Sequence, residues 1–129
     1  MRVIYGPRCS GKTYELMRIA HETDQYIIVP TQREAQQLFK KAKQLDMPIR
    51  MPVTVNECLR GNFRGTPYAR LHHNGGVLVD ETVRILSDIL RLPKIQAISV
   101  CARDSLALET RLDERLADHM RELGVEVDE

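Results

Sequence analysis

One octapeptide near the N-terminus constrains the fold more than any other part of this sequence. Residues 6–13 read Gly-Pro-Arg-Cys-Ser-Gly-Lys-Thr, which satisfies the pattern G-x-x-x-x-G-K-[ST] in full. In such a loop the glycines let backbone N–H groups turn inward around an anion, and a following helix presents its positive N-terminus to the same point. The pattern has this meaning only where it joins a strand to a helix, so the flanking residues decide its interpretation.

Both flanks agree with that requirement. Arg2–Tyr5 is a short β-prone run, and from Lys12 to about Glu22 the apolar residues recur at helical spacing. We therefore predict a phosphate-binding loop in which Lys12 reaches the β- and γ-phosphates of a nucleotide and Thr13 ligates Mg²⁺. The remaining predicted nucleotide-binding positions are Gly6, Pro7, Arg8, Cys9, Ser10 and Gly11.

Strands and helices are expected to alternate along the rest of the chain. Apolar runs predict strands at 26–29, 49–55, 77–80 and 95–100, with room for a short one at 125–127. Helices are expected at 12–22, 31–45, 56–60, 83–90 and 104–123, the last capped by Gly124. This alternation predicts a single α/β domain over residues 1–129. Its expected architecture is a three-layer sandwich around a mostly parallel sheet.

Three local signals refine this outline. Thr31 and Glu34 form the capping box that starts a helix. Pro52 weakens the strand at 49–55 or places it at a sheet edge. Residues 61–76 are rich in glycine, proline and asparagine, and we expect them to form a long exposed loop without regular structure.

Asp80 and Glu81 follow an apolar run and form the natural partner of the octapeptide. At the C-terminal end of a buried strand, Asp80 would hold the Mg²⁺ of a bound nucleotide. Glu81 stands one residue further on, where a carboxylate can orient or deprotonate an attacking water. The sequence therefore predicts ATP and Mg²⁺ as cofactors, with Glu81 and Lys12 as catalytic residues.

The octapeptide and the acidic pair together resemble the additional-strand, catalytic-glutamate class of P-loop ATPases. This class includes the RecA-like domains of helicases and phage packaging motors. The resemblance implies the P-loop NTPase (RecA-like) fold. It also implies a sensor strand between the P-loop strand and the metal-binding strand. Ile95–Val100 would be that strand, with Ser99 or Cys101 near its end as a polar sensor.

Two weaker matches point to the first RecA-like domain of helicases. Residues 30–35 are similar to the Pro-Thr-Arg-Glu-Leu-Ala motif of DEAD-box proteins, with a one-residue insertion at Gln32 or Arg33. Residues 53–59 loosely match the strand and helix that follow that motif. The resemblance spans residues 1–103, and only the P-loop and the acidic pair are specific within it.

The loop at 60–76 interleaves basic and aromatic groups, a composition that suits single-stranded nucleic acid. The residues concerned are Arg60, Phe63, Arg64, Tyr68, Arg70, His72 and His73. Basic residues also outnumber acidic ones between positions 31 and 72, whereas acids dominate beyond Asp80. An ordinary solvated loop would show the same composition, so both interpretations stay open.

Three functions are compatible with these residues. The leading one is an ATPase that acts on or beside nucleic acid, as a homo-oligomer or a subunit of a larger complex. In such an assembly Arg103, or Arg64, would reach a neighbouring subunit's nucleotide. The second is a thymidine-kinase-like small-molecule kinase, although the four-cysteine zinc site of that family is missing. The third is a nucleotide-binding module without turnover.

Composition excludes several other classes. Hydrophobic residues make up 43% and charged residues 29%, as in soluble globular proteins. No apolar run is long enough to cross a membrane, and Arg8 and Lys12 interrupt any secretory signal. The three cysteines form no C-x-x-C pair, so we expect neither a disulfide framework nor a zinc site, and a cytoplasmic location.

Overall fold

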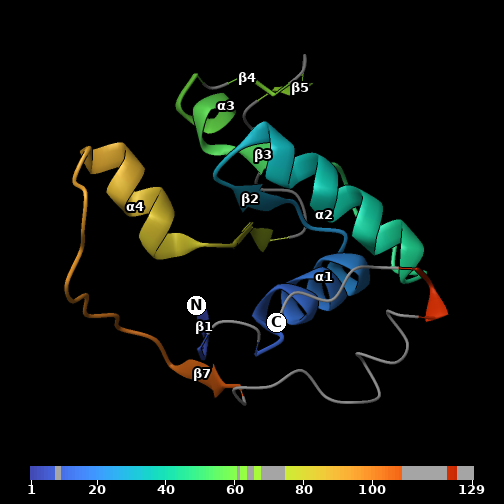
Figure 1. The fold of residues 1–129 in the computed structure, drawn as a ribbon, viewed down its shortest axis with the longest axis horizontal. Coiled ribbons are helices and arrows are strands. Elements are labelled where there is room, and N and C mark those ends of the chain that lie inside the picture. The colour runs from blue at the N-terminus through green and yellow to red at the C-terminus, as the bar shows by residue number, and fades with distance from the viewer. Residues whose placement is uncertain (8–9, 61, 64–65, 68–74, 109–121, 125–129) are drawn as a thin grey trace. The chain divides into compact units, whose positions relative to one another are not determined.

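The computed structural model describes residues 1–7, 10–60, 62–63, 66–67, 75–108 and 122–124 (Figure 1). Its elements are helices and short parallel sheets, so the protein has an α/β fold. The chain divides into two compact units. The first unit combines Met1–Glu15 with Ala97–Glu129, and the second spans Leu16–Gln96.

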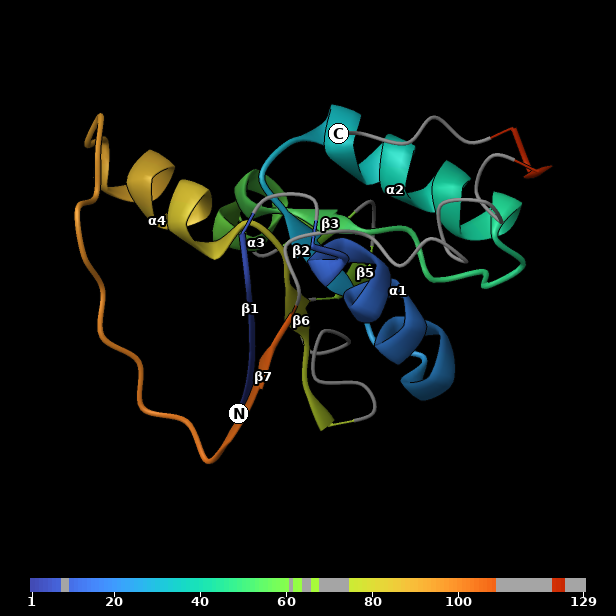
Figure 2. The same cartoon turned by 60° about the horizontal axis from the view of Figure 1, so that its bottom comes forward.

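The first unit contains two parallel strands that lie side by side (Figure 2). Strand β1 (Arg2–Tyr5) pairs with β7 (Asp104–Ala107), from Arg2 opposite Asp104 to Tyr5 opposite Ala107. The ladder continues one step beyond β7, where the Leu108 N–H donates to the Tyr5 carbonyl at 2.8 Å. Helix α1 (Lys12–Thr23) starts directly after the glycine-rich loop. The predicted order of strand, loop and helix is confirmed.

The predicted strand at Ile95–Val100 is wrong. Residues 95–100 have no regular structure, and Ile98 and Val100 are about half exposed, at 50% and 52%. The strand next to β1 is instead β7, at the position where the sequence predicted the start of the last helix. A strand needs a partner that satisfies its backbone groups, and β1 supplies those partners to residues 104–107. The predicted sensors Ser99 and Cys101 therefore lie on no strand and are exposed.

Most of the remaining predicted helix lies at 109–121, outside the described residues. The predicted glycine cap, Gly124, lies within the described residues. Gly124 adopts a φ of 74°, the left-handed conformation expected of a glycine after a helix end. The short strand expected at 125–127 also lies outside the described part of the chain.

The second unit is built on a three-stranded parallel sheet with the order β3–β2–β6. Its strands are β2 (Ile27–Val29), β3 (Val53–Thr54) and β6 (Leu78–Val79). Helix α2 (Gln32–Gln44) follows β2, α3 (Val55–Arg60) follows β3, and α4 (Thr82–Leu90) follows β6. Strand β3 is short and lies at an edge of this sheet in the described part of the chain, as Pro52 predicted.

The core of this unit lies between the central strand and α2, which contacts both β2 and β3. Ile27 and Val29 of β2 are almost completely buried, as expected of a strand covered on both faces. Helix α2 contributes its buried face, Ala35, Leu38 and Ala42. These positions recur at helical spacing, so the sequence pattern alone indicated which face packs inward.

Strand β6 is less buried than predicted. Val79 is 39% exposed and Leu78 is half-buried, whereas the apolar run suggested a strand covered on both faces. The reason lies in the strand order, because β6 forms an edge of the three-stranded sheet in the described part of the chain. An edge strand has a neighbour on one side only and is covered less completely.

The region at 61–76 is not wholly irregular, which corrects a second prediction. Strands β4 (Asn62–Phe63) and β5 (Thr66–Pro67) form an antiparallel pair, with Asn62 opposite Pro67 and Phe63 opposite Thr66. Two residues separate these strands in the sequence, and the second is glycine, which is typical of a tight hairpin. Pro67 is tolerated because a two-stranded pair leaves each strand an open edge.

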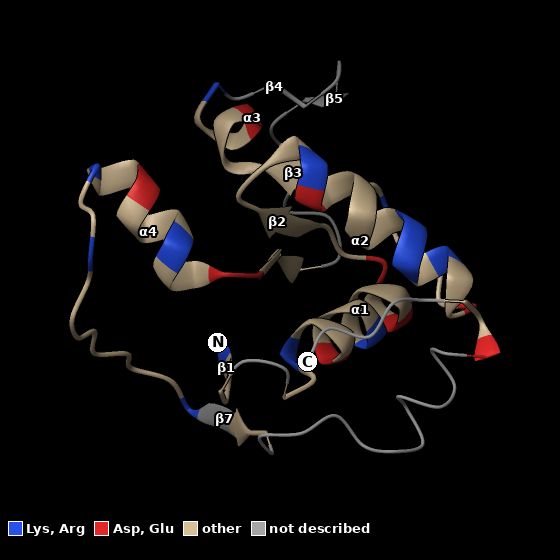
Figure 3. Cartoon of the chain, viewed as in Figure 1, with Lys and Arg blue, Asp and Glu red and all other residues tan. Residues whose placement is uncertain are grey.

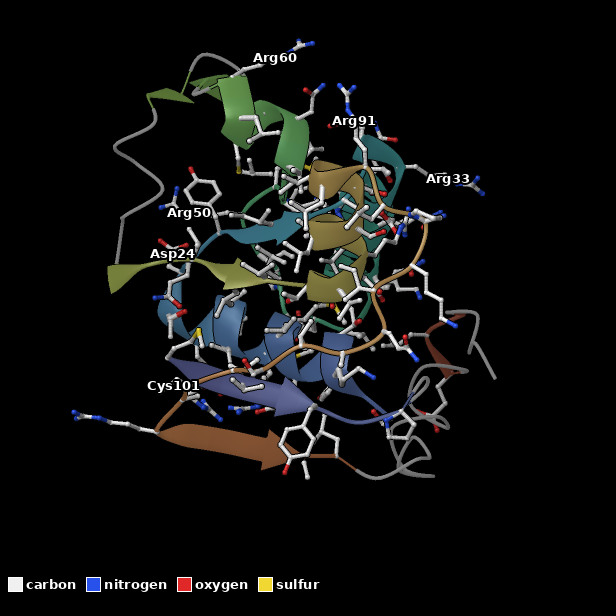
Figure 4. All side chains as sticks on the ribbon, turned by 90° about the vertical axis from the view of Figure 1, so that its left-hand side faces the viewer. Asp24, Arg33, Arg50, Arg60, Arg91 and Cys101 are labelled. Atoms are coloured by element: carbon white, nitrogen blue, oxygen red, sulfur yellow. The ribbon has the colours of Figure 1, made fainter. Side chains whose placement is uncertain are left out.

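An ion pair between Asp24 and Arg50 connects the end of α1 to the segment before β3. Arg50 donates to both carboxylate oxygens of Asp24, at 2.9 and 2.8 Å, and its guanidinium lies 5.4 Å from the centre of the Tyr26 ring. Figure 4 shows Arg50 turned toward Asp24. The hydrogen bond to Asp24 raises the pKa of Arg50 above its usual value, so this arginine stays charged.

Within the described residues, no helix is long and apolar enough to span a membrane.

Candidate functional site

The glycine-rich loop occupies the turn between β1 and α1. Strand β1 ends at Tyr5 and α1 begins at Lys12, so the loop leads directly into the helix N-terminus. The Glu15 N–H donates to the Gly11 carbonyl at 3.0 Å, which closes the first helical turn. Gly11 adopts a φ of 93°, a conformation that side chains disfavour. Arg8 and Cys9 lie outside the described residues.

Lys12 is folded back over this loop. Its Nζ donates to the Gly6 carbonyl at 2.5 Å and to the Pro7 carbonyl at 2.7 Å. The side chain is half-buried. The ammonium group is therefore held at the mouth of the loop by neutral acceptors, which a phosphate oxygen would outcompete because it is charged.

Gly6 is required at its position for steric reasons. A Cβ atom there would lie 2.7 Å from Ser10 Oγ and 2.9 Å from the Leu108 carbonyl oxygen. Both separations are shorter than real Cβ contacts, and the carbonyl belongs to the backbone and cannot move aside alone. The first glycine of the motif thus lets the loop close against the end of β7.

Ser10 has an unusual environment in this loop. It is only 7% exposed, and its Oγ has no hydrogen-bond partner among the residues that the structure describes. A buried hydroxyl without a partner costs about 1–3 kcal/mol, so such groups are rare in folded proteins. Together with Lys12 and the N-terminus of α1, this hydroxyl forms a set of donors that fits an anionic phosphate. Thr13 lies in the first turn of α1 and is half-buried.

The acidic pair follows β6. The Asp80 N–H donates to the Ile28 carbonyl at 3.0 Å, so Asp80 continues the pairing of β6 with β2. One of its carboxylate oxygens, Oδ1, accepts from the Glu81 N–H at 3.1 Å. Figure 3 shows this acidic pair directly before α4. Asp80 is half-buried, whereas Glu81 is exposed.

Glu81 adopts a left-handed backbone conformation, with φ 58° and ψ 47°. Residues other than glycine avoid this region at a cost of roughly 1–2 kcal/mol. Glu81 is also the N-cap of α4 and forms no side-chain capping hydrogen bond. Its carboxylate is thus not used to cap the helix that it precedes.

The two halves of the predicted site belong to different units. Gly6 to Thr13 lie in the first unit, and Asp80 with Glu81 lies in the second. The meeting of Lys12 and Thr13 with the acidic pair around one nucleotide therefore stays a prediction. Within the described residues, no three His, Cys, Asp or Glu side chains gather as a metal site.

Three arginines of the second unit point into solvent. Arg33, Arg60 and Arg91 are exposed and extend from the start of α2, the end of α3 and the end of α4 (Figure 4). Arg103, the predicted trans-acting arginine, is exposed in the first unit. Of the predicted nucleic-acid-binding loop, Phe63 lies in β4, whereas Arg64, Tyr68, Arg70, His72 and His73 lie outside the described residues.

Sequence reasoning missed two features near the carboxyl ends of the strands. Thr54 and Glu57 form a second capping box at α3, in which Thr54 Oγ1 accepts from the Glu57 N–H at 3.1 Å. The Thr-x-x-Glu spacing could have revealed it. The second feature is an ion pair between Arg84 of α4 and Glu34 of α2. No sequence signal indicated this pair, because fifty positions separate the two residues.

Burial and the neighbouring Glu57 raise the pKa of the Cys58 thiol. The thiol therefore stays protonated near neutral pH, where it is a poor nucleophile and a poor metal ligand.

Comparisons with protein-family models, with curated proteins and with solved structures found no match.

Proposed function

We propose that this protein is a Mg²⁺-dependent P-loop ATPase with a RecA-like fold. The loop between β1 and α1 carries the proposal. It combines a lysine held over two loop carbonyls with a buried hydroxyl that has no partner in the described part of the chain. These donors converge on the N-terminus of a helix, where an anion is stabilised. A glycine-rich turn of purely structural use would need neither the lysine nor the buried hydroxyl.

Each residue has a separate role in this proposal. Lys12 would exchange its two carbonyl acceptors for phosphate oxygens of ATP, and Ser10 would gain the acceptor that it lacks. Thr13 and Asp80 would hold Mg²⁺, which neutralises charge on the phosphates. Glu81 would orient the water that attacks the terminal phosphate. Its carboxylate is exposed and forms no capping hydrogen bond with α4.

The partner that we propose is nucleic acid, bound by an oligomer or a larger complex. Exposed Arg33, Arg60 and Arg91 support this proposal, because arginines in solvent are suited to phosphate contacts. The two alternative functions would yield different products. A small-molecule kinase would transfer phosphate to a nucleoside, and a nucleotide-binding module would release no phosphate.

The test uses two variants of the full chain. Lys12→Ala is expected to lose nearly all MgATP affinity, because the lysine contacts the phosphates in the ground state. Glu81→Gln is expected to keep that affinity and to lose turnover, because the carboxylate acts only when water attacks. Binding is measured by calorimetry and turnover by phosphate release.

Phosphate release is measured without addition, with single-stranded DNA or RNA, and with nucleosides. Stimulation by a nucleic acid supports the proposed partner, whereas phosphorylation of a nucleoside identifies a kinase. If Glu81→Gln released phosphate at the parent rate, the assignment of Glu81 would be wrong. If the parent bound MgATP and released no phosphate under any condition, the ATPase proposal would fail.

A further inference from the structure

Glu34 connects two helices that begin near the carboxyl ends of neighbouring strands. One of its carboxylate oxygens, Oε2, accepts from the Thr31 hydroxyl at 2.9 Å, within the capping box of α2. The other oxygen, Oε1, accepts from Nη1 of Arg84 on α4. Thr31, Glu34 and Arg84 therefore form a continuous network from the N-cap of α2 to the first turn of α4.

Helix α4 has few other anchors among the described residues. Ile85 is its one buried residue, whereas Val83, Ile89 and Leu90 are between 45% and 52% exposed. Its N-terminus has no side-chain cap, unlike the N-terminus of α2. An ion pair in the first turn of such a helix has more influence on its position than the same pair on a well-packed helix.

Arg84 also lies one helical turn beyond Glu81. The Ile85 N–H donates to the Glu81 carbonyl at 2.9 Å, so the first turn is hydrogen-bonded to the residue with the left-handed backbone. A strained conformation persists only where the surrounding structure holds it. The first turn of α4 is part of that surrounding structure. The ion pair of Arg84 with Glu34 connects this turn to α2.

We propose that the Arg84–Glu34 ion pair is a positioning device, which sets the direction of the Glu81 carboxylate by holding the first turn of α4 against the capped start of α2. This inference rests on the proposed ATPase function. Arg84 is a positioning residue in it, because it acts through Glu81 and touches no substrate.

The test removes the ion pair from both sides. Arg84→Ala removes the cation. Glu34→Gln removes the charge that attracts Arg84 but keeps an oxygen for Thr31, since glutamine also serves in a capping box. Each variant is expected to lower kcat by roughly 10- to 100-fold, the loss that about 1 Å of misplacement causes, with KM for MgATP unchanged. The double variant is expected to lose no more than either single variant.

Arg18→Ala is the matched control. Arg18 forms an ion pair with Glu22 on the surface of α1, in which its Nη1 donates to both carboxylate oxygens, and its side chain is 37% exposed, compared with 48% for Arg84. This variant is expected to keep the parent kcat. A kcat for Arg84→Ala equal to that of the control, or losses that multiply in the double variant, would overturn the proposal.

Amide hydrogen exchange separates this inference from the proposed function. Exchange at residues 80–85 is expected to be faster in Arg84→Ala and in Glu34→Gln than in the parent and in Arg18→Ala. A parent without ATPase activity would refute the proposed function, yet it would leave this measurement intact. Unchanged exchange at residues 80–85 would refute the positioning role, whatever the activity of the parent.

Discussion

At the scale of single residues, Ser10 and Gly6 constrain the loop before α1. Ser10 Oγ is buried and has no hydrogen-bond partner among the described residues, and Gly6 lies so close to Ser10 and Leu108 that it has no room for a side chain. A chain selected for stability alone would place alanine at position 10, because an unsatisfied hydroxyl costs about 1–3 kcal/mol. The proposed phosphate-binding role would account for a serine at this position.

Ser10→Ala therefore has opposite effects on folding and on binding. Without nucleotide, we expect the free energy of unfolding to rise by about 1 kcal/mol, because the unsatisfied group is gone. With MgATP, we expect affinity to fall roughly 5- to 10-fold, the value of about one hydrogen bond. Denaturant unfolding and calorimetry measure the two effects.

Gly6→Ala is the contrasting variant. Its Cβ would meet Ser10 Oγ and the Leu108 carbonyl, so we expect stability to fall by about 1–3 kcal/mol, as in other overpacked sites. A Ser10→Ala protein that is less stable than the parent would show that this hydroxyl has a partner in the folded protein. The explanation that the unsatisfied Ser10 hydroxyl lowers the stability of the parent would then be wrong.

At the scale of elements, the helices of the second unit differ in how they begin and end. Helices α2 and α3 each start with a Thr-x-x-Glu box, in which the threonine Oγ1 accepts from the N–H of the glutamate three residues later. Helix α4 is flanked by its N-cap Glu81 and its C-cap Arg91, and both of these residues have left-handed backbones, with φ values of 58° and 56°. The two ends of α4 therefore carry similar strain, but only one adjoins the candidate site.

Replacing each strained residue by glycine tests that difference. Glycine adopts positive φ freely, so Arg91→Gly and Glu81→Gly are each expected to raise the free energy of unfolding by about 0.5–1 kcal/mol. Arg91→Gly is expected to keep the parent rate of ATP hydrolysis, whereas Glu81→Gly is expected to abolish it. Thermal unfolding and phosphate release are measured on the same samples. Normal hydrolysis by Glu81→Gly would show that the carboxylate has no part in turnover.

At the scale of the whole molecule, the boundary between the two units falls inside α1, between Glu15 and Leu16. The candidate phosphate loop thus belongs to one unit and the acidic pair to the other. In phosphoryl transfer, an arginine from a neighbouring subunit often neutralises charge in the transition state and accelerates the reaction by roughly 10³–10⁵. Arg103 is exposed and is our candidate for this role.

An arginine supplied in trans makes activity depend on assembly. We expect specific ATPase activity to rise with protein concentration, because each site needs a neighbour. Mixing Lys12→Ala with Arg103→Ala subunits is expected to restore part of the activity, since some interfaces then combine an intact loop with an intact arginine. Sedimentation measures the assembly under the same conditions. Constant specific activity from a fully active monomer would contradict the trans mechanism.

The sequence by itself determined the features that depend on neighbouring residues. The start of α1 at Lys12, the capping box at Thr31 and the buried face of α2 follow from local spacing, and the structure has each of them. Within the candidate site, the motif identified Lys12 and Gly6 by the same local pattern. The motif did not predict that Lys12 would contact the Pro7 carbonyl or that Gly6 would lie against the Leu108 carbonyl.

Only the tertiary structure decided the features that need a partner from elsewhere in the chain. Strand β7 forms at 104–107 and not at 95–100 because β1 pairs with the later segment. Strand β6 is more exposed than its apolar run suggested because it lies at a sheet edge. The Arg84–Glu34 pair joins residues fifty positions apart. Strand pairing and long-range ion pairs depend on which segments meet in space. Local residue spacing does not predict those meetings.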